Sequence, residues 1–198
     1  MTSSQPLVRE DSHDCSRHAA DTVGQAAAVL GMLHRIPADH AEVSARLALL
    51  ADRSADIACE LLGESAERCA LGRALHSVVI HLRTTAELAD RHRVTVLADE
   101  LVEVVGIVRE CGQNTARSFA APLDSVWAAH YRAEILRLAD DADDAFRRLF
   151  ARWYFDTDDL TTVAGMREVG DELENVMLAF ESVADAAVAA DRPGEPPR

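Results

Sequence analysis

Apolar residues recur at intervals of three and four along almost the whole chain, which is the spacing of one face of an α-helix. One such stripe contains Leu138, Ala142, Phe146 and Leu149. Breaks with Pro, Gly or clustered acids separate six segments of this kind. The sequence therefore predicts an all-α protein of six helices, with short connections that favour helical hairpins packed side by side.

The six helices have recognisable start and stop signals. The first is predicted from about Ser16 to His34, before Pro37, because proline cannot continue a helix. The next two start at the capping residues Asp39 and Ser65 and end near Gly63 and in the charged run 90–93. The fourth is predicted to carry Val94 and Leu97 and to end before Pro122. The fifth starts at Asp124 or Ser125, with Trp127 on its apolar side, and the acidic turn 156–159 caps the sixth.

A buried strand is an alternative for residues 102–108, which are rich in Val. The segment alternates poorly at a period of two residues, and its length favours helix.

Two stretches of the chain resemble each other. The segment Ala45–Leu61 matches residues 134–150, with Ala-Asp at Asp56 in the first and at Asp143 in the second. This predicts two repeated three-helix bundles, 15–93 and 94–188, packed on a shared core as one compact domain. Residues 1–14 are predicted to be a disordered lead and 189–198 a disordered tail.

The charge balance limits the partners. The formal net charge is −14, and all 20 basic residues are Arg. No basic stripe is present to neutralise phosphates, so nucleic acid and an anionic membrane surface are both disfavoured as partners. The balance fits metal cations or a basic surface on a partner protein.

Cysteine spacing and hydropathy indicate the compartment. None of the 4 Cys forms a C-x-x-C pair, which suggests small core residues in a reducing compartment. No signal-peptide pattern and no apolar run of about 18 residues are present. The expectation is a cytoplasmic protein without direct membrane insertion, which could still sit under a membrane protein. The sequence also lacks the glycine-rich and zinc-protease motifs of common enzymes, so we expect no enzymatic activity.

Paired carboxylates are the candidate site residues. At spacings of three and four, side chains share one helix face, as for Asp52 with Asp56, Asp140 with Asp143, and Asp171 with Glu174. Such oxygen ligands suit a hard divalent cation or iron. The alternative is an ordinary solvated acidic surface.

The segments LRLADDADDAF (136–146) and MREVGDELENVMLAFESVA (166–184) resemble the carboxy-terminal half of PhoU-like proteins. The branch in question comprises phosphate transport regulators, or accessory proteins of Pit-type phosphate permeases. The resemblance spans about residues 19–187 and implies metal sites of the form E/D-x-x-x-D, to which Asp52, Asp56, Asp143, Asp171 and Glu174 correspond.

Several positions depart from the family pattern. Ala139 and Arg167 replace expected acids, and His76, Ser77 and Ile80 stand where the family has an Asp-Asp-x-x-Asp run. The connector 63–69 is also shorter than in the family. Two complete metal sites are therefore not expected, and the expectation is one reduced carboxylate site or none. His76 could replace a lost carboxylate ligand, or it could simply be hydrogen-bonded or solvated.

The resemblance implies a non-enzymatic regulator or accessory protein of phosphate transport. Its partner would be a membrane phosphate permease or a signalling protein, which would hold it at the inner face of the membrane. The alternative function is a helical metal-binding protein with carboxylate ligands, in storage or redox work. The lone Glu10-x-x-His13 motif counts against that alternative, because ferritin-type sites need two. The apolar content also permits a homodimer.

Overall fold

The computed structural model describes residues 6–34, 39–63, 65–121, 124–155 and 160–191. Its helices are α1 (Pro6–Leu30), α2 (His40–Glu60), α3 (Ala66–Arg91), α4 (Asp99–Ser118), α5 (Ser125–Phe155) and α6 (Leu160–Asp191). The 3-10 turns η1 (Gly31–His34) and η2 (Leu61–Gly63) follow α1 and α2. Within these ranges there is no strand, which confirms the all-α prediction. Residues 102–108 lie inside α4, so the strand alternative is wrong.

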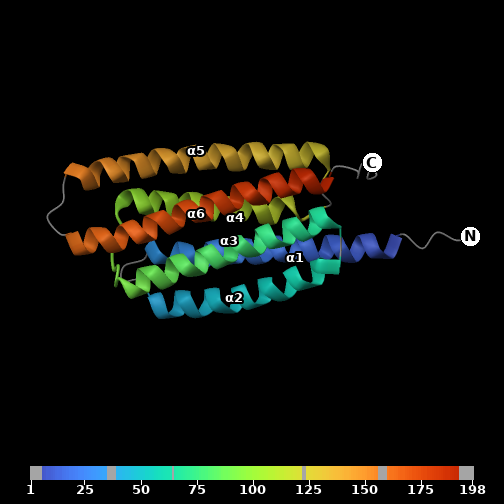
Figure 1. Cartoon of the computed structure of the whole chain (residues 1–198), viewed down its shortest axis with the longest axis horizontal. Helices are drawn as coiled ribbons and strands as arrows, with labels where there is room; N and C mark the ends of the chain where they lie inside the picture. Colours follow the sequence, from blue (N-terminus) through green and yellow to red (C-terminus); the bar gives the residue numbers. More distant parts are fainter. Residues whose placement is uncertain (1–5, 35–38, 64, 122–123, 156–159, 192–198) are drawn as a thin grey trace, which may run out of the picture.

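Successive helices run in opposite directions along one long bundle (Figure 1). Helices α1, α3, α4 and α6 form its centre, while α2 and α5 lie on opposite outer sides. Helix α2 packs on α1 and α3, and α5 packs on α4 with α6. The first three helices therefore form one set and the last three another. The principal contacts between these two sets are α3 with α6 and α1 with α4.

Three predicted capping residues occupy the positions expected of them. Asp39 accepts a hydrogen bond from the Glu42 backbone N–H at 3.0 Å, and Ser65 begins α3 in the same way. Asp124 accepts from the backbone N–H groups of residues 126 and 127. These side chains satisfy first-turn donors that have no partner inside the helix.

The predicted apolar stripes form one continuous core. Large side chains from all six helices are almost completely buried in it, among them Leu30, Leu47, Leu75, Leu101, Leu138, Leu173 and Phe180. One stripe position is wrong, because Trp127 is 58% exposed. Ala128, the next residue, takes the buried position in this first turn of α5.

Two helix starts differ from the prediction. Helix α1 begins at Pro6, ten residues before Ser16, so the predicted disordered lead is helical from Pro6 to Asp14. Proline fits there, because the first helical residue needs no N–H partner. Helix α4 begins only at Asp99, after a non-helical segment 94–98. Arg93, with φ of 51°, ends α3 in a left-handed conformation, although Val94 and Leu97 beyond it are still buried.

Two predictions concern the end of the chain and a turn. Helix α6 continues to Asp191, beyond the predicted start of the tail at 189. The rest of the tail and the acidic turn 156–159 lie outside the described residues.

Candidate functional site

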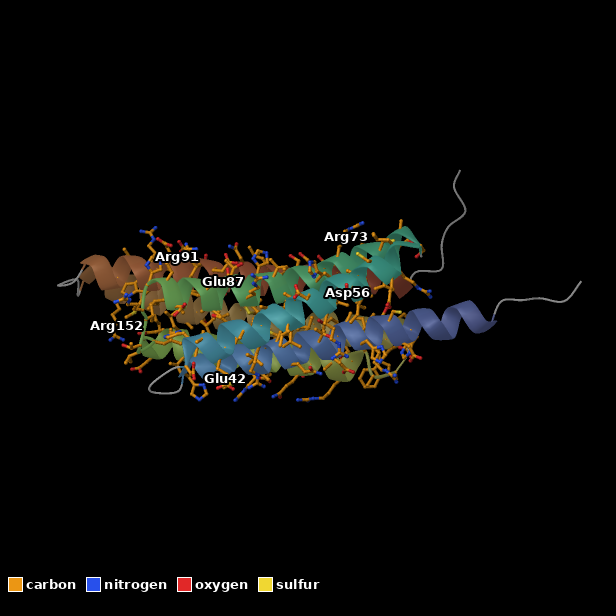
Figure 2. All side chains as sticks on the ribbon, turned by 90° about the horizontal axis from the view of Figure 1, so that it is seen from below. Glu42, Asp56, Arg73, Glu87, Arg91 and Arg152 are labelled. Atoms are coloured by element: carbon orange, nitrogen blue, oxygen red, sulfur yellow. The ribbon has the colours of Figure 1, made fainter. Side chains whose placement is uncertain are left out.

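The first predicted acidic pair lies on an outer helix. Asp52 and Asp56 are both exposed on α2, and Figure 2 shows Asp56 on this surface. Their spacing of four places them on one side of the helix, as predicted. Helix α2 does not pack against α5 (Figure 1). The acids of the first predicted repeat and those of α5 therefore do not share a site.

His76 is hydrogen-bonded in the interface between α2 and α3. Its Nδ1 lies 2.7 Å from Ser54 Oγ, and Ser54 is 3% exposed. The Ser54 hydroxyl donates to the Ala51 carbonyl at 2.9 Å, so the imidazole N–H donates to the hydroxyl oxygen. Of the two interpretations of His76, the structure favours the hydrogen-bonded histidine.

The other predicted acids lie along the seam between α5 and α6. We define the α5–α6 acidic seam by the α5 residues Asp140 and Asp143 and the α6 residues Asp171, Glu174, Glu181 and Asp185. Glu174 and Glu181 are half-buried, whereas the four aspartates are exposed.

The carboxylates of the seam influence one another. Desolvation raises the pKa of Glu174, and the negative charges of Asp171 and Asp143 raise it further. The pKa of Glu181 is raised first by desolvation and then by Asp143, Asp185 and Asp140. Asp143 of α5 thus acts on both Glu174 and Glu181 of α6, while Asp140 acts on Glu181. Sequence spacing alone could not establish these relationships across two helices.

Sequence reasoning missed Glu181 and Asp185 as members of this group. Both continue the α6 stripe of Asp171 and Glu174 at intervals of seven and four, so the helical period could have found them. Asp185 also accepts a hydrogen bond from Arg132 of α5 at 2.7 Å, which neutralises one end of the seam.

The described residues contain no group of three or more His, Cys, Asp or Glu side chains that could hold a metal ion. All seven predicted ligands, Asp52, Asp56, His76, Asp140, Asp143, Asp171 and Glu174, fall within this described part. The carboxylates of the seam are close enough to repel one another, but they do not converge on one point as the ligands of a metal ion would.

Two histidine–glutamate pairs that the sequence did not predict link the α3 side to α6. His81 Nδ1 lies 2.8 Å from Glu172, and His92 Nε2 lies 2.9 Å from Glu168. Asn175 donates a second hydrogen bond to Glu172 at 2.9 Å. No within-helix spacing reveals these pairs, because each joins residues more than 70 positions apart in sequence.

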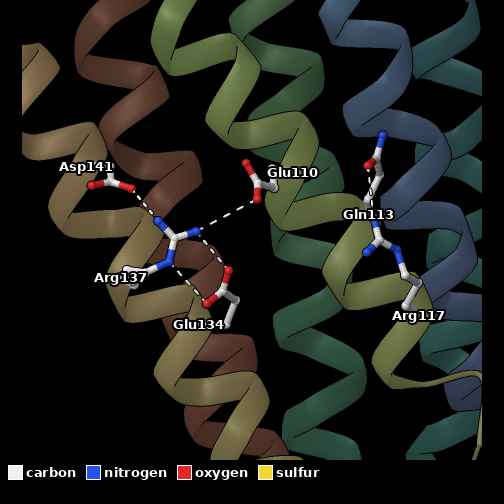
Figure 3. Close-up of polar contacts among 6 residues, drawn as sticks. All are labelled: Glu110, Gln113, Arg117, Glu134, Arg137 and Asp141. Carbon is white, nitrogen blue, oxygen red and sulfur yellow. Dashed lines mark hydrogen bonds and ion pairs between the residues drawn. The ribbon is translucent and has the colours of Figure 1, made fainter.

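On the α4 side of α5, Arg137 is surrounded by carboxylates (Figure 3). It donates to Glu134 and Asp141 within α5 and lies 3.8 Å from Glu110 of α4. The hydrogen bond from Arg137 is the main cause of a lowered Glu134 pKa. On this side of α5 the Arg137 guanidinium therefore offsets part of the negative charge of the three carboxylates around it.

The buried thiol and phenol are not activated groups. Desolvation is the largest cause of a raised pKa for both the Cys111 thiol and the Tyr131 phenol. Cys111 is fully buried, and the Tyr131 hydroxyl bonds with Thr115 at 2.8 Å. Cys59 is exposed, contrary to the expectation that the cysteines are core residues.

In comparisons with known proteins, no family model and no curated protein sequence matches this chain. The resemblance to PhoU-like proteins therefore stays a prediction. Over the described residues, no helix combines the length and apolarity needed to span a bilayer.

Proposed function

We propose that this chain is a non-enzymatic, PhoU-like regulator or accessory protein of inorganic phosphate transport. It acts at the inner face of the membrane by docking a rigid helical surface on a phosphate permease. The observation that carries the proposal is how its helices pair.

The helix contacts match those of a duplicated three-helix protein. Helices α1, α2 and α3 pack on one another, as do α4, α5 and α6. The two sets meet through α1 with α4 and α3 with α6. A pseudo-twofold axis relating two copies would pair each of these helices with its own counterpart. This arrangement supports the predicted repeat and, with it, the resemblance to PhoU-like proteins.

The α5–α6 acidic seam supports docking on a membrane protein. The cytoplasmic loops of membrane proteins carry an excess of Lys and Arg. Opposite charges on the two surfaces would accelerate encounter and fix the orientation of the complex. Glu174 and Glu181 have raised pKa values because they are partly desolvated among other carboxylates, so a basic partner would relieve their repulsion.

Binding of the purified chain to the phosphate permease of its own organism, reconstituted in lipid nanodiscs, tests this proposal. We expect saturable binding that weakens as salt is raised. The double variant Asp140→Asn/Asp143→Asn should weaken it. The matched variant Asp52→Asn/Asp56→Asn, which removes the same charge from α2, should not. Equal binding to empty nanodiscs, or no binding at all, would exclude docking on this permease.

The alternative function is a helical metal-binding protein with carboxylate ligands, and the α5–α6 acidic seam is its candidate region, although no group of three or more described His, Cys, Asp or Glu side chains could hold a metal ion. Desolvation first, and then repulsion from Asp171 and Asp143, raise the Glu174 pKa, and a bound cation would remove that repulsion. The metal content of the purified protein separates the two functions.

A further inference from the structure

A cavity of about 410 Å³ lies at the end of the bundle where α4 and α6 begin and α5 ends. Its apolar wall includes Leu97 of the segment before α4, Trp153 of α5 and Met166 of α6. This volume is within the range of small-molecule sites in proteins, which are mostly apolar with a few polar groups that fix orientation. The cavity therefore has the size and lining of a binding site for a small organic molecule.

The two charged residues that line this cavity differ in whether another described residue already pairs with their charge. Arg152, visible at this end of the bundle in Figure 2, lines the cavity and bonds with both carboxylate oxygens of Glu100 through Nη1. Its positive charge is thus balanced by Glu100. Asp99, the other charged lining residue, is exposed, and no other described residue forms a hydrogen bond or ion pair with its carboxylate. The local balance of these three groups is one negative charge.

The negative charge favours a cation in this cavity, and the indole ring of Trp153 adds to that preference. The face of an indole carries negative potential and attracts cations, and a Met thioether is an adaptable apolar contact. Trp153 and Met166 lie on the same cavity as the Asp99 carboxylate. The net charge of −14 also raises the local concentration of cations around the whole chain.

We propose that this cavity binds a small organic cation, an ammonium group carried on an apolar body. The body packs on Leu97, Trp153 and Met166, and the ammonium group faces Asp99. The site is independent of docking on a permease, since it lies on neither the α5–α6 acidic seam nor the α2 surface.

Intrinsic fluorescence reports on this site directly. The chain has 2 Trp residues, and Trp127 is 58% exposed. In a Trp127→Phe background the full chain therefore has Trp153 as its only indole. Titration with 2-phenylethylammonium should change the Trp153 emission saturably. The matched carboxylate, 3-phenylpropionate, should bind at least about five-fold more weakly, the size of one exposed charge interaction.

Two variants locate the binding. Asp99→Asn should weaken 2-phenylethylammonium binding about five-fold, whereas Asp56→Asn, which removes one negative charge elsewhere, should leave it unchanged. Val163→Phe, which enlarges a side chain lining the cavity, should abolish binding. Circular dichroism confirms that each variant keeps its helix content.

Three results would overturn the proposal. They are the absence of saturation with 2-phenylethylammonium, equal or tighter binding of the carboxylate, and undiminished binding in the Val163→Phe variant.

Discussion

Gly112 of α4 lies directly against Ala27 of α1. A Cβ atom built on Gly112 would fall 2.5 Å from the Ala27 Cβ, closer than two non-bonded carbon atoms can approach. Gly24 of α1 faces the same crossing, where an added Cβ would meet Ala116 at 3.0 Å. One of the two contacts that join the halves of the bundle thus depends on residues without side chains.

Gly112→Ala should destabilise the protein by about 1–3 kcal/mol, because α1 and α4 must move apart to admit one methyl group. The matched change is Gly106→Ala on the same helix, where an added Cβ meets nothing within 4 Å. There the higher helix propensity of Ala should stabilise by up to about 1 kcal/mol. Urea unfolding measures both. Stabilisation by Gly112→Ala would show that the helices do not cross this closely.

Leu138→Ala should cost about 2–5 kcal/mol in free energy of unfolding, because the side chain is 1% exposed and its loss leaves a cavity. Leu178→Ala is the control, since Leu178 is 59% exposed on α6. Its free energy of unfolding should change by less than about 0.5 kcal/mol. Similar losses in both variants would mean that the assigned core face of α5 is wrong.

Glu174→Gln should stabilise the protein at pH 7. The folded state raises the Glu174 pKa, so the favourable contribution of this group exists below its unfolded pKa of about 4.3 and is lost as pH rises through the folded value. The advantage of the variant should therefore grow as pH rises from 4 to 7. Urea unfolding at several pH values measures it.

Glu134→Gln should change the stability at pH 7 in the opposite direction. Arg137 lowers the Glu134 pKa, so that contribution is present above the unfolded pKa and is lost as pH falls through the folded value. The variant should be less stable at pH 7 and should approach the wild type in acid. If both variants changed the stability at pH 7 in the same direction, the electrostatic description of Glu134 on α5 and Glu174 on α6 would be contradicted.

Elemental analysis of protein purified without chelators should find no stoichiometric iron, zinc or manganese. The described carboxylates repel one another without converging on one point, and none of the groups they form could hold a metal. Near-stoichiometric metal that disappears in the Glu174→Gln variant would favour the metal-binding alternative. Loss in Asp52→Asn/Asp56→Asn instead would place a site on α2.

Local features of the sequence predicted the helices well and their contacts less well. The apolar period located the core face of every helix, and Asp39 and Ser65 marked two helix starts because capping depends on adjacent residues. The early start of α1 was missed because residues 9–14 are polar, so that Leu7 and Val8 do not begin an apolar period. The turn at Arg93 was missed because a left-handed Arg has no sequence signature.

For the candidate site too, the sequence predicted relationships within one helix but not those between helices. Spacing within one helix paired Asp171 with Glu174, and after desolvation the negative charge of Asp171 is the next cause that raises the Glu174 pKa. Whether pairs on different helices meet depends on helix packing, which spacing does not encode. Hence the contribution of Asp143 to the Glu174 environment, and the pairing of His81 with Glu172, came only from the structure.

The most direct test of the proposed function is phosphate uptake by the organism that carries this chain. Uptake of radiolabelled phosphate is compared in the wild type, in a deletion of the coding sequence, and in the deletion complemented with the intact chain. A regulator or accessory protein predicts altered uptake on deletion, restored by the intact chain and not by the Asp140→Asn/Asp143→Asn variant. Uptake unchanged by the deletion, in both phosphate-replete and phosphate-starved cells, would contradict a role in phosphate transport.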